Sequence, residues 1–182
     1  MKRAIIIHCW EGYPEYCWYP YVKQELKKNG FKVDVPHFPE TELPRLDIWL
    51  LKLKEIVGEP DENLFLIGHS IGAVTILRYL ENLAEGQKIG GVVLVAGFTD
   101  DMGYKEFRNF FIEPLDFEMI KDCAKNYVAI HSDNDPYISA EYGNVFADKL
   151  KAKLIIKHDM KHFSIGCKEL PDVVDAILEI SK

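Results

Sequence analysis

The sequence of 182 residues predicts an α/β fold with about six mostly parallel strands in one sheet and helices on both faces. Two observations predict this fold. Short β-branched apolar runs alternate with amphipathic stretches of roughly ten residues, which is the spacing of βαβ units. The apolar runs are nearly continuous, as expected for strands that are buried on both faces of a parallel sheet.

Composition narrows the class of protein further. Hydrophobic residues make up 48% of the chain, which favours one globular domain spanning residues 1–182. The net charge of −7 argues against a nucleic-acid partner, and the apolar stretches are too short to span a membrane. The apolar run that begins at Ala4 is also too short for a secretory signal. A cytoplasmic protein whose four cysteines are reduced is therefore expected.

The first half of the chain contains clear start and stop signals. Pro20 suits the first turn of a helix, and Asn29-Gly30 suits its end. The loop before that helix, Cys9–Tyr19, is rich in glycine, proline and aromatic residues. The predicted elements are strand Arg3–His8, helix Pro20–Lys28, strand Phe31–Val35, helix Asp47–Val57 and strand Asn63–Ile67.

The second half continues the same alternation. Its predicted elements are helix Ile71–Leu83, strand Gly91–Ala96, helix Asp116–Ala124, strand Tyr127–Ser132, helix Ala140–Leu150, strand Lys153–Lys157 and helix Leu170–Ile180. Ligands of such folds bind at the carboxyl ends of the parallel strands. Histidine, serine and aspartate residues follow several of these strands, so we expect the chemistry to gather at one rim of the sheet.

The motif Gly68-His69-Ser70-Ile71-Gly72 lies between a predicted strand and a predicted helix. A G-x-S-x-G motif in that context is a nucleophile elbow, where a strained turn holds the serine hydroxyl above the sheet. Glycines suit the flanking positions because a Cβ there would collide with neighbouring backbone. The alternative is that Ser70 simply caps the helix.

A nucleophilic serine needs a histidine base and an acid that orients the base. In the chain order Ser, Asp or Glu, His, the acid follows a late strand and the base follows the last one. Asp133 and Asp135 are the candidates for the acid, and His158 and His162 are the candidates for the base. The residues alone leave both choices open.

The chain resembles the small α/β-hydrolases of the family that includes retinoblastoma-binding protein 9 and its bacterial relatives. The resemblance covers nearly the whole chain and is carried by Gly68–Gly72, Trp18–Pro20, Val92–Val95, Asp133–Tyr137 and Lys161–Phe163. It implies a compact α/β-hydrolase fold and a serine hydrolase. It also implies that Asp135, directly before a proline, is the acid. Members of the family carry the base in a Gly-His-Phe sequence near the C-terminus, and this implies that His162 is the base. Lys161 stands here in place of the glycine.

An oxyanion hole requires two N–H donors. The residue after the nucleophile supplies one, the backbone N–H of Ile71. The loop after the first strand supplies the other, and there the backbone N–H of Trp10 is expected. Cys9 stands where many α/β-hydrolases have glycine. It is either a reactive thiol at the rim or a buried inert one.

Aromatic residues in the first loop and after the fourth strand suggest an acyl pocket. Trp18, Phe98 and Phe163 are predicted to line it, with packing in the core as the alternative. The i, i+4 spacing of His158 and His162 would suit a metal only on a helix, and this stretch reads as a strand end and a loop. No metal and no cofactor are expected.

The sequence thus predicts a serine hydrolase that cleaves small carboxylic esters through an acyl-enzyme on Ser70. Two alternatives remain at this stage. The chain could be an amidase or peptidase, because the chemistry up to acylation is shared. It could also be a hydrolase fold that serves as a protein-interaction module with little turnover, although no clear motif points to a protein partner.

Overall fold

A computed structural model describes residues 1–182 and contains one six-stranded sheet in the order β2-β1-β3-β4-β5-β6. Every neighbouring pair of strands is parallel, so the sheet is entirely rather than mostly parallel. The strands are β1 (Arg3–Ile7), β2 (Lys32–Asp34), β3 (Leu64–His69), β4 (Gly91–Val95), β5 (Tyr127–Ser132) and β6 (Lys153–Lys157).

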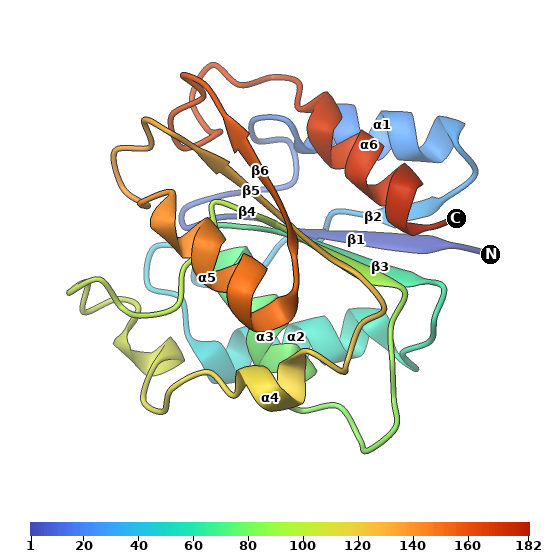
Figure 1. Ribbon diagram of the computed structural model, residues 1–182, viewed down its shortest axis with the longest axis horizontal. Coiled ribbons are helices and arrows are strands. Elements are labelled where there is room, and N and C mark those ends of the chain that lie inside the picture. The colour runs from blue at the N-terminus through green and yellow to red at the C-terminus, as the bar shows by residue number, and fades with distance from the viewer.

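Helices cover both faces of this sheet (Figure 1). On one face lie α1 (Tyr19–Lys28) and α6 (Pro171–Ile180), side by side. The other face carries α2 (Leu46–Val57), α3 (Ile71–Leu80), α4 (Phe117–Ile120) and α5 (Glu141–Leu150). A short 3₁₀ helix, Arg108–Phe110, lies between β4 and α4.

The alternation of side chains along the strands divides the core in two. In β1, Ile5 and Ile7 belong to the cluster beneath α2 and α3, whereas Ala4 and Ile6 belong to the cluster beneath α1 and α6. Strands β3, β4 and β5 are buried along their whole length. Burial on both faces accounts for the continuous apolar runs of the sequence.

Most predicted elements are present, with shifted ends. The prediction for β5 and β6 is confirmed to the residue, whereas β3 runs on to His69 and brings the strand directly to the elbow. The helix predicted over Asp116–Ala124 is wrong in extent, because only Phe117–Ile120 is helical. Asp116 caps it through a hydrogen bond from the Met119 N–H, and Ala124 pairs with Ile89 in an isolated β-bridge.

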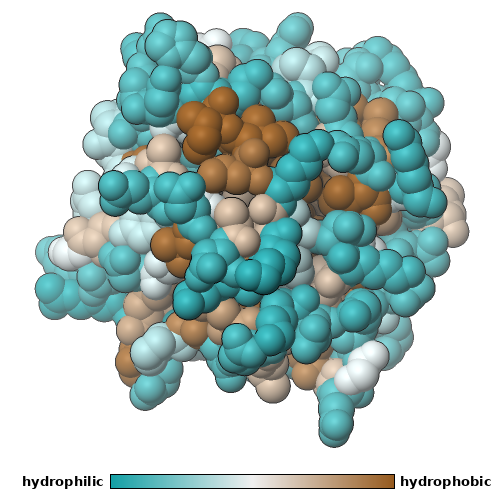
Figure 2. Space-filling view, in the orientation of Figure 1, coloured by the Kyte–Doolittle hydropathy of each residue, from teal (hydrophilic) through white to brown (hydrophobic).

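The surface is mostly hydrophilic in the view of Figure 2, with an apolar patch in its upper part over β6. That strand is the edge of the sheet, and Ile156 on it is 48% exposed. Lys153 and Lys157, at the two ends of this strand, pair with Glu179 and Asp172 of α6. None of the helices has the length and apolar character needed to cross a membrane.

Candidate active site

Ser70 occupies a strained backbone turn between β3 and α3. Its φ of 56° and ψ of −121° are values that non-glycine residues rarely adopt. Its side chain makes no capping hydrogen bond, which argues against the helix-cap alternative. The geometry is that of a nucleophile elbow.

The two glycines of the motif are required by close backbone approaches. A Cβ at Gly68 would lie 2.5 Å from the Ala73 Cα, and a Cβ at Gly72 would lie 2.3 Å from the Ile7 carbonyl oxygen. Both distances are far below van der Waals contact. The glycines therefore let α3 start directly against β1 and turn the chain sharply at Ser70.

Asp135 and His162 form a buried pair at the carboxyl ends of β5 and β6. The His162 Nδ1 lies 2.7 Å from the Asp135 Oδ2, and the two side chains are 12% and 1% exposed. The backbone N–H groups of Tyr137 and Ile138 donate to Asp135 Oδ1 at 2.9 and 3.1 Å. The carboxylate thus accepts hydrogen bonds from three donors, the two backbone N–H groups and the His162 Nδ1–H.

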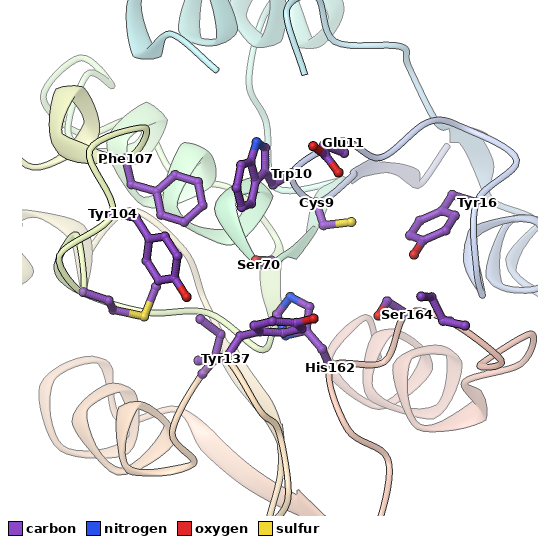
Figure 3. A pocket seen from close by; sticks show the side chains of 13 residues that line it. Cys9, Trp10, Glu11, Tyr16, Ser70, Tyr104, Phe107, Tyr137, His162 and Ser164 are labelled. Carbon is purple, nitrogen blue, oxygen red and sulfur yellow. The ribbon is translucent and has the colours of Figure 1, made fainter. Parts of the chain in front are cut away.

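That bond fixes the tautomer of His162. With the proton on Nδ1, the neutral ring has an unprotonated Nε2 that can accept a proton. Ser70 and His162 line the same cavity, and Figure 3 shows the imidazole beside Ser70 with a ring nitrogen directed toward it. Tyr137 packs edge-on against the imidazole, with the ring centroids 5.3 Å apart.

A second histidine–aspartate pair lies nearby on the surface. His158 Nδ1 is 2.6 Å from Asp133 Oδ2, but the His158 side chain is 91% exposed. The hydrogen bond to Asp133 raises the pKa of His158, and the pKa of Asp133 is lowered by the Asp159 N–H and then by His158. Neither residue lines the cavity that contains Ser70.

Of the two expected oxyanion donors, Ile71 directly follows Ser70 and Trp10 lines the same cavity as Ser70. Ile71 is the first residue of α3, where N–H groups have no partner within the helix. Trp10 follows β1 and lines the cavity, and its backbone N–H makes no hydrogen bond within the protein. Both amides are therefore free to bind an anion.

Cys9 fits its loop without backbone strain, because its φ is not positive. The residue is 5% exposed, and burial raises the pKa of its thiol to about 11. A thiol of that kind stays protonated at neutral pH, which favours the inert alternative.

Lys161 stands where the family has a glycine, and it has a φ of 50°. It therefore adopts the left-handed conformation for which glycine is favoured.

The cavity beside Ser70 has a volume of about 300 Å³ and two unlike ends. In Figure 3 one end is walled by Trp10, Phe107 and Tyr104. The Trp10 ring centroid lies 5.3 Å from that of Phe107 and 6.4 Å from that of Tyr104. Met102 also lines the cavity.

The other end of the cavity carries polar groups. Tyr16 and Ser164 lie there, on the far side of Ser70 from Phe107 and Tyr104, and Glu11 lies beside Trp10 (Figure 3). The Glu11 carboxylate makes no ion pair in the structure, and no lysine or arginine lines the cavity. The permanent charge of the cavity is therefore negative.

The prediction that Trp18, Phe98 and Phe163 line the pocket is wrong. All three side chains are fully buried and none of them lines the cavity. Trp18 and Phe163 pack in the core beneath α1 and α6, and Phe98 packs in the core on the opposite face. The alternative of core packing holds for them.

Two loops nevertheless supply much of the lining, as the sequence suggested. Trp10 and Tyr16 come from the first loop, and Met102 and Phe107 come from the loop after β4. Sequence reasoning missed Tyr137, Ile138, Ser164 and Ile165. Their positions two or three residues after Asp135 and His162 were the signal that could have found them.

The sequence is similar to known proteins along nearly its whole length. Residues 4–177 match the family described as Serine hydrolase. The chain is 30% identical over 179 residues to YdeN of Bacillus subtilis (strain 168), a protein described as a hydrolase. The alignment covers 97% of this chain and 94% of YdeN. It is 32% identical over 165 residues to Serine hydrolase RBBP9 of Rattus norvegicus, covering 88% and 86%.

Solved structures show the same fold. The crystal structure of the B. subtilis ydeN gene product superimposes with a TM-score of 0.93 at 29% identity, covering 99% of this chain and 98% of that one. Est1E of Butyrivibrio proteoclasticus, solved with bound ferulic acid, has a TM-score of 0.81 at 18% identity, covering 100% and 90%. The chain belongs to the serine hydrolase family, and it is an enzyme with the α/β-hydrolase fold.

Proposed function

We propose that the protein hydrolyses small, uncharged or cationic carboxylic esters through an acyl-enzyme on Ser70. The observation that carries the proposal is the shared cavity of Ser70 and His162, with His162 held at Nδ1 by the buried Asp135. A nucleophile, a base and an orienting acid in this arrangement support acyl transfer. Free thiols at all four cysteines support a reducing, cytoplasmic setting for the reaction.

In the first half of the reaction, Ser70 Oγ attacks the ester carbonyl carbon and its proton passes to His162 Nε2. Asp135 stabilises the imidazolium that forms. The N–H groups of Ile71 and Trp10 donate to the oxyanion of the tetrahedral intermediate. The intermediate collapses as the C–O bond to the alcohol breaks, and His162 gives the alcohol its proton.

In the second half, water replaces the alcohol. His162 takes a proton from the water as its oxygen attacks the acyl-enzyme, and the same donors hold the second oxyanion. Collapse breaks the bond to Ser70 Oγ, which regains its proton, and the carboxylic acid leaves. No cofactor enters either half.

The cavity supports a limit on substrate size and charge. About 300 Å³ lies at the small end of ligand pockets, so short acyl chains fit beside Trp10, Phe107 and Tyr104. Glu11 repels a carboxylate, and no lysine or arginine compensates for it within the cavity. Dicarboxylic monoesters are therefore expected to be poor substrates.

Labelling with a fluorophosphonate probe tests the nucleophile. Wild type is expected to label, and Ser70→Ala is expected not to label while keeping the same melting temperature within a few degrees. A wild-type protein that does not label would refute the acyl-enzyme and would favour an interaction module with little turnover.

A panel of p-nitrophenyl esters then tests the pocket. Turnover is expected to be highest for chains of about two to four carbons and lower for the monosuccinate than for the neutral butyrate. Glu11→Gln is expected to narrow the gap between succinate and butyrate by about three- to tenfold. An unchanged gap in Glu11→Gln would remove Glu11 from the account of specificity.

A further inference from the structure

Three hydrogen bonds run from the first loop to the base loop through two fully buried side chains, Tyr19 and His69. The Cys9 N–H donates to the Tyr19 hydroxyl at 3.0 Å. The Tyr19 oxygen is 2.7 Å from His69 Nδ1. His69 Nε2 is 2.8 Å from the carbonyl oxygen of His162.

The direction of each bond follows from the proton inventory. The carbonyl oxygen of His162 can only accept, so His69 Nε2 carries a proton and donates to it. A neutral imidazole protonated at Nε2 has an unprotonated Nδ1, so the Tyr19 hydroxyl donates to Nδ1 while its oxygen accepts from the Cys9 N–H. This one arrangement satisfies every donor and acceptor in the three hydrogen bonds.

Burial keeps the arrangement in place. The pKa of His69 lies well below its ordinary value, first because of desolvation and then because of the neighbouring His162. Desolvation also raises the pKa of Tyr19 well above its ordinary value. Both shifts favour the neutral groups, and a protonated His69 would also lose its acceptor at Nδ1.

The two ends of this hydrogen-bond network are the parts of the site that must be aligned with Ser70. Cys9 precedes Trp10, a proposed oxyanion donor, and His162 is the proposed base. His69 directly precedes Ser70, and its ring lies 5.1 Å from the His162 ring between centroids. One small network thus connects the loops after β1, β3 and β6.

We propose that Tyr19 and His69 are positioning residues that fix the base and the oxyanion loop relative to the nucleophile. This inference rests on the proposed function. Neither side chain lines the cavity, so neither touches substrate. Their effect is expected in the rate of the chemical step rather than in substrate binding, since a displacement of about 1 Å at a reacting group can slow a reaction 100-fold.

Tyr19→Phe tests the proposal because it removes one hydroxyl and retains the ring. We expect kcat on p-nitrophenyl butyrate, counted per active site titrated with fluorophosphonate, to fall about 10- to 100-fold with KM within about twofold. Tyr127→Phe is the matched control. Tyr127 is the first residue of β5, and its buried hydroxyl donates to the Ile120 carbonyl. The kcat of Tyr127→Phe should be unchanged.

A second pair of variants covers the case in which Tyr19→Phe does not fold. His69→Gln keeps an acceptor for Tyr19 and a donor for His162 on one side chain, and it should retain several-fold more kcat than His69→Leu. Equal kcat in His69→Gln and His69→Leu, or a Tyr19→Phe effect confined to stability or to KM, would overturn the proposal.

The tautomer supplies a readout that does not depend on turnover. Nitrogen-15 NMR of wild type should show His69 neutral and protonated at Nε2 from about pH 5 to 8. An Nδ1–H signal assigned to His69 itself would overturn the network even in an active enzyme. A wild type with the expected tautomer but without fluorophosphonate labelling would instead refute the proposed function.

Discussion

His162 and His158 each hold an aspartate through Nδ1, yet they lie in opposite surroundings. The His162 side chain is 12% exposed and shares a cavity with Ser70, whereas the His158 side chain is 91% exposed. An imidazole activates a nucleophile only within reach of it. The surroundings, rather than the aspartate partner, therefore favour His162 over His158 as the proposed base.

Alanine variants of the two histidines test this assignment. His162→Ala is expected to lower kcat on p-nitrophenyl butyrate by at least about 1,000-fold, because Ser70 then has no base. His158→Ala is expected to keep activity within about twofold, since an exposed pair contributes little. The reverse order of activities would make His158 and Asp133 the working pair.

The proposed catalytic residues were more predictable than those that line the pocket. The family resemblance maps the acid to Asp135 and the base to His162, and their contact was therefore expected. Trp18 and Trp10 come from the same aromatic loop, but one is core and the other lines the cavity. Composition cannot separate them, because the direction of a side chain in an irregular loop depends on tertiary packing.

The packing of α3 against β1 depends on the absence of one side chain. Gly72 lies in the first turn of α3, where a Cβ would lie 2.3 Å from the Ile7 carbonyl oxygen. Backbone on both sides leaves no flexible group that could move away. The start of the helix and the end of the strand are therefore in fixed contact.

Gly72→Ala should separate these elements and displace the elbow. We expect a loss of about 2–4 kcal/mol of unfolding free energy and a loss of fluorophosphonate labelling. Gly86→Ala is the control, because a Cβ there meets nothing within 4 Å and only the φ of 81° is unfavourable. That control should lose about 1 kcal/mol and label normally. Equal effects at both positions would contradict the steric account.

Periodicity predicted most helices and strands because each is buried on a face that imposes a pattern. The β5 and β6 bounds agree to the residue, while α4 is much shorter than its pattern indicated. Cys123 and Ala124 lie beyond its end because the chain there pairs with Ile89 through backbone bonds. Such a long-range contact leaves no local signal.

Buried histidines couple the stability of the molecule to pH. Burial lowers the pKa of both His8 and His131 to about 4, with a smaller contribution from His37 at His8. In the unfolded chain the same groups titrate near their ordinary pKa of 6.5. Below that pH the unfolded chain binds protons that the folded chain excludes, so stability falls from about pH 6.5 toward pH 4.

Urea unfolding at pH 7 and pH 5 checks this coupling. Each of the two histidines is expected to contribute about 2 kcal/mol to the loss of unfolding free energy at pH 5. His131 Nε2 has no hydrogen-bond partner, so His131→Leu breaks no bond there and should reduce the loss by about 2 kcal/mol. We propose that residues 1–182 form one domain, and a single transition is expected. A pH-independent stability would contradict neutral burial of these groups.

The left-handed turn at Ser70 also sets a limit on how stable this enzyme can be. A non-glycine residue in that conformation carries about 1–3 kcal/mol of strain. Ser70→Gly should therefore melt a few degrees above Ser70→Ala, which keeps the strain, although both lack the nucleophile. Equal melting temperatures would mean that the turn is relaxed. Selection for thermostability alone would thus favour glycine at position 70, although glycine cannot act as the nucleophile. Stability and catalysis therefore place opposite demands on this one residue.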